Sequence, residues 1–130
     1  MCSAIFEGGV DILETIIMNF EGNKMATLQS GVREISDRMG SIFGTKGYIQ
    51  VQNINNPEKI TVFNQNHEET ASYFPPKQIT GYEYEVRACK KALEEGKIEC
   101  PEMPHAETVR IMEIMDGLRK SWGYEIPEVE

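Results

Sequence analysis

Histidine and cysteine are scarce in this chain, whose 130 residues include two histidines and three cysteines. A structural zinc site takes four ligands, usually supplied in close pairs such as Cys-x-x-Cys. The wide spacing of these few residues provides no such pair, even if Cys100 and His105 are considered together, so the sequence predicts no metal site. An odd number of cysteines without a spacing pattern also argues against a disulfide framework and favours a reducing compartment. We therefore expect a cytoplasmic protein.

Basic residues are outnumbered by acidic ones, 13 to 21, and the resulting net charge is −8. Affinity for nucleic acid and for anionic membranes depends on clustered Lys and Arg, so we expect neither partner. Long apolar runs are missing as well, since stretches such as Ile-Ile-Met at 16–18 are far shorter than the roughly 20 residues that cross a bilayer. The start of the chain also lacks the pattern of a targeting peptide.

The sequence also lacks the glycine motifs that bind phosphate. A dinucleotide-binding fold carries GxGxxG between a strand and a helix, and the chain has no such motif. The stretch FGTKGYIQV at 43–51 places Lys46 before its second glycine and continues with strand-forming residues, which fails the P-loop spacing GxxxxGK[ST]. It predicts a β-hairpin instead, with a type I turn at residues 45 and 46 and Gly47 in the left-handed conformation.

Nucleophilic catalysis requires a Ser, Cys or Thr beside a base, and neither histidine meets this condition by sequence. His67 falls in a predicted strand and His105 at a predicted helix start, where surface or capping roles are the simpler interpretation. Paired glutamates such as Glu83 and Glu85 fit solvated helix faces. The residues themselves therefore point to no self-contained active site.

The residues that are present predict one globular domain over 1–130, because 40% are hydrophobic and 26% charged. Alternating and β-branched runs joined by tight turns predict about six antiparallel strands. These strands cover residues 10–20, 24–29, 38–43, 47–52, 59–64 and 67–74.

After Pro75 and Pro76 the pattern becomes helical. One amphipathic helix carries Tyr82, Val86, Cys89 and Leu93 and ends at Gly96; a second carries Ile111, Met115, Leu118 and Trp122 and ends at Gly123. Strands followed by helices predict an α+β fold, with both helices packed on one face of the sheet.

The other face of the sheet needs its own explanation, because the apolar side chains of the strands do not fit on one side. They include Met18, Met25, Met39, Ile42, Tyr48 and Phe63. Either a partner subunit or another part of a larger chain covers this second face, or the expected strand registers are shifted by one residue.

Four stretches in order resemble the C-terminal domain of the Gfo/Idh/MocA family of NAD(P)-dependent oxidoreductases, which includes glucose-fructose oxidoreductase, inositol dehydrogenase and dihydrodiol dehydrogenase. They are ETIIMNFEGNKMATLQSG at 14–31, SIFGTKGYIQV at 41–51, NNPEKITV at 55–62, and GYEYEVRACKKALEEGKIECPEMPHAETVRIMEIMDGLRKSWG at 81–123. The last stretch is the most specific, and together they cover nearly the whole chain.

Family members begin with a glycine-rich Rossmann domain, followed by a Glu-Lys-Pro segment and a later histidine that serve catalysis. No position here matches these motifs, so the resemblance implies no catalytic and no cofactor-binding residue in this chain. It implies NAD or NADP for the full-length protein, with the missing Rossmann domain elsewhere in the parent chain. The chain is accordingly similar to the C-terminal piece of such an enzyme and is expected to be inactive alone.

The resemblance also implies a homodimer formed through the open sheet face, and loops that wall the substrate pocket. Asn55, Asn56, Lys77 and Gln78 are the candidates for this wall, and plain surface turns are the alternative interpretation. The reaction of the intact enzyme would be hydride transfer between a nicotinamide and a sugar, polyol or diol. The other hypothesis is a stand-alone dimeric interaction or small-molecule-binding module that has the same fold and no enzymatic activity.

Overall fold

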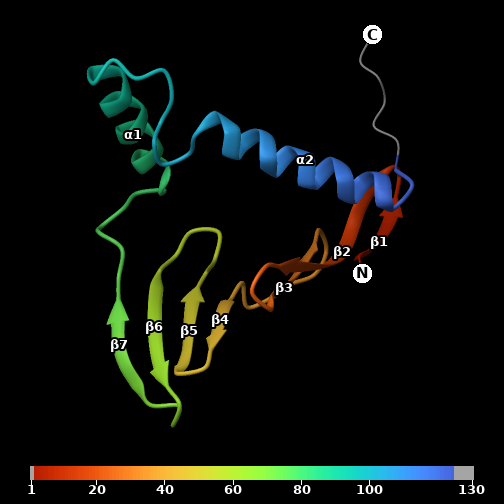
Figure 1. Ribbon diagram of the computed structural model, residues 1–130, viewed down its shortest axis with the longest axis horizontal. Helices are drawn as coiled ribbons and strands as arrows, with labels where there is room; N and C mark the ends of the chain where they lie inside the picture. Colours follow the sequence, from red (N-terminus) through yellow and green to blue (C-terminus); the bar gives the residue numbers. More distant parts are fainter. Residues whose placement is uncertain (1, 125–130) are drawn as a thin grey trace. The chain divides into compact units, whose positions relative to one another are not determined.

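The computed structural model describes residues 2–124, which form seven β-strands and two α-helices (Figure 1). All strands precede the helices, and every strand pair is antiparallel. The predicted α+β class, made mostly of antiparallel sheet, is therefore confirmed. None of the helices in the described residues is long and apolar enough to cross a membrane.

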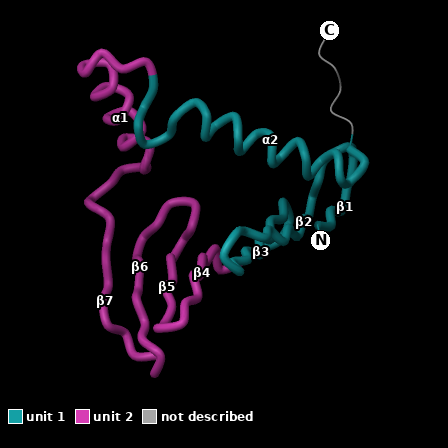
Figure 2. The backbone as a smooth tube through the Cα atoms, in the orientation of Figure 1, with its two compact units in different colours: residues 1–35, 99–130 teal, residues 36–98 magenta. Residues whose placement is uncertain are grey.

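The chain divides into two compact units, one made of residues 1–35 with 99–130 and the other of residues 36–98 (Figure 2). The first unit holds β1 (Cys2–Glu7), β2 (Val10–Phe20), β3 (Lys24–Gly31) and α2 (His105–Ser121). The second holds β4 (Gly40–Gly44), β5 (Gly47–Gln52), β6 (Lys59–Asn64), β7 (Glu69–Tyr73) and α1 (Tyr82–Glu94). The single domain over 1–130 stays a prediction.

The strands form two sheets, whereas the sequence predicted about six strands in one. The first sheet has the order β1-β2-β3 and the second has the order β4-β5-β6-β7. Strand β1 was not predicted, although Gly8 and Gly9, which directly follow it, are a sequence signal for a hairpin turn. Both have positive φ, 59° and 81°, which suits the tight turns that join hairpin strands. Residues 32–39, between β3 and β4, take no strand conformation, and the sheets are separate elements.

The hairpin predicted at Gly44–Gly47 is confirmed, because Gly44 at the end of β4 pairs with Gly47 at the start of β5. Gly47 has a φ of 146°, and a Cβ at this position would lie 2.0 Å from the carbonyl oxygen of Phe63. Glycine is required here by a close approach of the β6 backbone as well as by its φ. The prediction for His67 was wrong: it lies in a turn with a φ of 62°, not in a strand.

Apolar side chains lie on both faces of the second sheet. Ile49 is paired with Ile42 and Val62, so these three share one face, and Tyr48 is paired with Phe43 and Phe63 on the other. Little of this apolar surface is covered: Ala92 is the one buried hydrophobic residue among residues 2–124. Within α1 the predicted apolar stripe is exposed, with 70% of Tyr82 and 77% of Leu93 accessible to solvent.

Candidate functional site

Two of the four predicted pocket-wall residues meet in the structure. The side-chain nitrogen of Gln78 donates a hydrogen bond of 2.9 Å to Oδ1 of Asn56, and Nδ2 of Asn56 donates to the carbonyl oxygen of Thr80 at 3.4 Å. Both side chains are half-buried, whereas Asn55 and Lys77 are exposed. The loop before β6 and the segment before α1 are thus joined through Asn56.

The loop that carries Asn56 is closed by its own hydrogen bonds. Asn53 has a positive φ of 55°, its carbonyl oxygen accepts from the backbone N–H of Asn56 at 3.0 Å, and its side-chain nitrogen donates to Glu58 at 2.8 Å. Asparagine tolerates this left-handed conformation better than most residues. This turn therefore fixes the path of the chain at Asn56, beyond the end of β5.

Glu83 organises the other half of the junction, at the start of α1. Its carboxylate accepts hydrogen bonds from the backbone N–H groups of Ile79 at 2.6 Å, Gly81 at 2.9 Å and Thr80 at 3.2 Å, and from the Thr80 hydroxyl at 3.2 Å. The helix begins after Gly81, which has no side chain to cap it, so Glu83 satisfies donors that would otherwise lack a partner. These donors, the Ile79 N–H first, lower the pKa of Glu83 to about 2.

Sequence reasoning missed Glu83, because helical periodicity assigned it to a solvated face. The signal that was available is an acidic residue in the first helical turn directly after a glycine, where a carboxylate can reach free backbone N–H groups. With four hydrogen bonds and a low pKa, this carboxylate is a poor general base at neutral pH. The arrangement is suited to holding two loops in place, not to proton transfer.

A second feature of the same unit is a shallow hollow of about 390 Å³ at the β4–β5 hairpin. Its lining consists of the apolar residues Ile42, Tyr48, Ile49, Val62 and Phe63 and the hairpin residues Gly44, Thr45, Lys46 and Gly47. Its lining is mostly apolar, so the hollow fits an apolar side chain better than a polar substrate.

The two histidines lie in different units and have ordinary surroundings. The ring of His67 lies 5.8 Å from that of Tyr48. At the start of α2, the backbone N–H of His105 donates to Glu99 at 2.7 Å, and its Nδ1 lies 3.7 Å from the same carboxylate. Among residues 2–124, no group of three or more His, Cys, Asp and Glu side chains is arranged to hold a metal ion.

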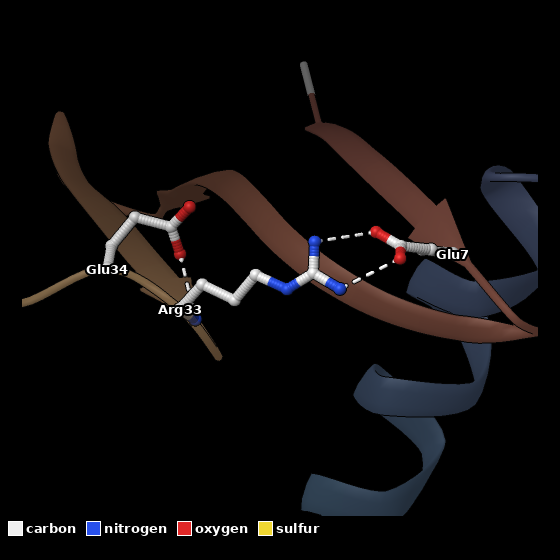
Figure 3. A network of polar contacts seen from close by, with 3 residues as sticks. All are labelled: Glu7, Arg33 and Glu34. Atoms are coloured by element: carbon white, nitrogen blue, oxygen red, sulfur yellow. Dashed lines mark hydrogen bonds and ion pairs between the residues drawn. The ribbon is translucent and has the colours of Figure 1, made fainter.

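The first unit contains a polar network of its own, drawn in Figure 3. Arg33 makes a bidentate contact with Glu7, with Nη1 2.7 Å and Nη2 2.8 Å from its two oxygens, and the Arg33 backbone N–H lies 3.3 Å from the Glu34 carboxylate. All three residues are exposed. The network joins the end of β1 to the segment after β3, and ion pairs of this exposure contribute little to stability.

Comparison with known proteins finds relatives along almost the whole chain. It is 25% identical over 134 residues to the trans-1,2-dihydrobenzene-1,2-diol dehydrogenase of Mus musculus, covering 95% of this chain and 38% of that protein. The enzyme of the same name from Xenopus laevis is 30% identical over 131 residues (95% of this chain, 39% of that protein), and the one from Homo sapiens is 25% identical over 127 (94% and 38%).

The chain thus spans about two fifths of the length of the curated relatives it matches. No protein-family model matches it. Dihydrodiol dehydrogenases are among the enzymes to which the sequence motifs pointed, so the resemblance to this group of oxidoreductases is supported at the level of distant homology. That the chain corresponds to the C-terminal domain alone stays a prediction.

Proposed function

We propose that this chain is the C-terminal, substrate-pocket and oligomerisation part of a cytoplasmic NAD(P)-dependent oxidoreductase that acts on a sugar, polyol or diol. One observation carries the proposal: similarity to the dihydrodiol dehydrogenases runs through 94–95% of this chain while it covers 38–39% of each relative. A segment related over its full length to part of an enzyme is expected to do what that part does.

The chemistry of the proposed reaction is hydride transfer between the substrate and a bound nicotinamide. NAD or NADP would be held by the Rossmann domain of the parent protein, and the glycine hairpin at Gly44–Gly47 leads into a strand, which does not suit a pyrophosphate. This chain supplies no catalytic and no cofactor-binding residue, and alone it is inactive. Its contribution is to shape the substrate pocket and to form a homodimer through a sheet face.

Within this role, the junction at Asn56 gives the four pocket-wall candidates different tasks. Asn56 and Gln78 bond to each other and so set the position of the wall. Asn55 and Lys77 are their exposed neighbours in the chain, with an amide and an ammonium group that can bond to hydroxyl groups of a polyol or diol. In this proposal the first pair positions the wall and the second pair contacts substrate.

A chimera tests the proposal. In the Mus musculus relative, the matched 134-residue segment is replaced by this chain, and oxidation of trans-1,2-dihydrobenzene-1,2-diol is followed by absorbance at 340 nm with NAD⁺ and with NADP⁺ in turn. We expect turnover by the chimera and none by the 130-residue chain alone. A chimera that folds and binds the reduced cofactor, as seen by its fluorescence, but does not oxidise the diol contradicts the proposal. That result favours a stand-alone binding module.

A further inference from the structure

The hollow at the β4–β5 hairpin combines features that the proposed function does not use. Its volume of about 390 Å³ lies at the lower end of the range for small-molecule sites, about 300–1,000 Å³. The aliphatic residues of its lining, Ile42, Ile49 and Val62, come from three neighbouring strands, and their pairing places them on one face of the sheet. The hollow therefore offers a small molecule an apolar surface.

The hollow and the predicted pocket wall lie at opposite ends of β5. Gly47, at the start of this strand, lines the hollow, whereas Asn53, which follows the end of the strand at Gln52, opens the loop that carries Asn56. At about 3.3 Å per residue, β5 separates the two places by roughly 17 Å. A small molecule in the hollow would therefore not occupy the predicted substrate pocket.

Two contacts hold the turn of this hairpin in place. Nε2 of Gln65, in the turn after β6, donates a hydrogen bond of 2.7 Å to the carbonyl oxygen of Thr45. At Gly47 the backbone lies so close to β6 that a Cβ would come within 2.0 Å of the Phe63 carbonyl oxygen. Because Lys46 lies between these two anchored residues, its backbone is positioned before any ligand arrives, which lowers the entropy cost of binding.

Lys46 gives the hollow its charge. Among the described residues that line the hollow, it is the one with a charged side chain. Lys59 pairs with the carboxylate of Glu69, whereas the ammonium group of Lys46 makes no ion pair or hydrogen bond within residues 2–124. The chain carries a net charge of −8 and repels anions over most of its surface, but an unpaired ammonium group beside apolar side chains attracts one.

We infer that the hollow binds a small molecule with an apolar body and one carboxylate. The apolar body lies on Ile42, Ile49 and Val62, and the carboxylate pairs with Lys46 at the turn. A neutral molecule would lack the ion pair, and a second carboxylate would lie unpaired on an apolar surface, so the site selects a monocarboxylate. The inference goes beyond the proposed function, because it adds a second ligand site to the unit that carries the pocket wall.

Phenylbutyrate and its neutral analogue phenylbutyramide test the inference, because they share one apolar body and differ in the carboxylate. Each is titrated into the isotope-labelled 130-residue chain, and the backbone amide signals are followed by NMR. We expect saturable shifts at residues 44–49 and 62–63, which line the hollow. Phenylbutyrate should bind about three- to fivefold more tightly than the amide, the factor expected of one exposed ion pair.

Three variants and a matched control separate the contribution of the charge from that of the apolar surface. Lys46→Gln should weaken phenylbutyrate binding to the level of the amide, and Lys46→Arg should retain the preference for the acid. Ile42→Ala, at an exposed position of the outer strand β4, should weaken the binding of both molecules by a similar factor. Lys24→Gln, the same change at an exposed lysine after the β2–β3 turn, is the control and should keep the wild-type affinities.

Three results would overturn the inference. They are the lack of a saturable shift at these residues up to the solubility limit of phenylbutyrate, equal wild-type affinities for acid and amide, and an unchanged preference in Lys46→Gln. The amide spectrum shows whether each variant is folded, and the comparison of the two molecules on wild type stands even if a variant is not. Diol turnover by the chimera is measured separately, so failure of this site and failure of the proposed function are distinguishable.

Discussion

The ring of Phe6 lies parallel to the ring of Tyr124, with centroids 5.5 Å apart and an interplanar angle of 8°. Phe6 also meets Trp122 edge to face at 6.3 Å, so one side chain of β1 joins the residues that follow α2 to the sheet of the first unit. The pairing of β1 with β2 shifts register between Ile5 and Phe6. Such a bulge redirects a side chain, which is consistent with Phe6 facing the residues that follow α2.

Phe6→Ala should lower the free energy of unfolding by about 2 kcal/mol, because it removes two aromatic contacts made by a side chain that is 36% exposed. Trp122 is the single tryptophan, so its fluorescence in a urea titration reports on this site directly. Phe20→Ala, at a more exposed position of β2, is the control and should cost less than about 1 kcal/mol. Equal losses in the two variants would contradict the role of Phe6.

The glycine pair of the β4–β5 hairpin offers a matched comparison. Gly47→Ala should destabilise the chain by about 3 kcal/mol, since its Cβ would lie 2.0 Å from the Phe63 carbonyl oxygen, a backbone atom that cannot move away cheaply. Gly44→Ala places a Cβ 3.5 Å from the nearest atom and should change stability by less than about 1 kcal/mol. Thermal unfolding of both variants measures the difference, and similar midpoints would refute it.

Glu83 gives a prediction on the acid side of the pH range. Its folded-state pKa of about 2 lies below the ordinary value of 4.5, so its ionisation stabilises the fold fully above pH 4.5, and this contribution is lost as the pH falls towards 2. Glu83→Gln should therefore be less stable than wild type at pH 7, and the difference should shrink between pH 4.5 and 2. Chemical denaturation followed by circular dichroism at several pH values measures it.

The control for Glu83 is Glu85→Gln, which removes a charge from the same helical turn without touching the backbone N–H groups of residues 79–81. It should have the smaller effect on stability at pH 7. A constant difference between wild type and Glu83→Gln from pH 7 to 2 would show that the ionised carboxylate does not hold the start of α1.

Most elements of the fold were predictable because their patterns are local. The strands at 47–52 and 59–64 lie where alternation and β-branching predicted them, and α1 begins at Tyr82 as its periodicity required. Strand β1 was missed because a six-residue run at the chain start gives a weak pattern, although the glycine pair after it is a hairpin signal. The division into two sheets was not predictable, since the pairing of strands depends on residues distant in sequence.

The candidate site was predicted only in part, for a physical reason. The choice of Asn56 and Gln78 found two residues that meet, but their contact depends on the positive φ of Asn53, which directs the loop, and sequence alone does not give that angle. The role of Glu83 depends on backbone N–H groups that precede the helix, and side-chain periodicity carries no information about them. Whether Asn55 and Lys77 contact a substrate stays a prediction.

Asn56→Ala tests whether the Asn56–Gln78 contact holds the predicted pocket wall. The substitution removes both side-chain hydrogen bonds of Asn56, worth about 1 kcal/mol, so amide hydrogen exchange at Thr80 and Gly81 should accelerate roughly fivefold. Asn55→Ala, one residue away and exposed, should leave this exchange unchanged. In the active chimera, Asn55→Ala should raise the KM for the diol and leave kcat unchanged, because it removes only a binding contact with the substrate. Asn56→Ala should change both KM and kcat, because it displaces the pocket wall. Equal exchange rates in wild type and Asn56→Ala would mean that Glu83 alone fixes the segment before α1.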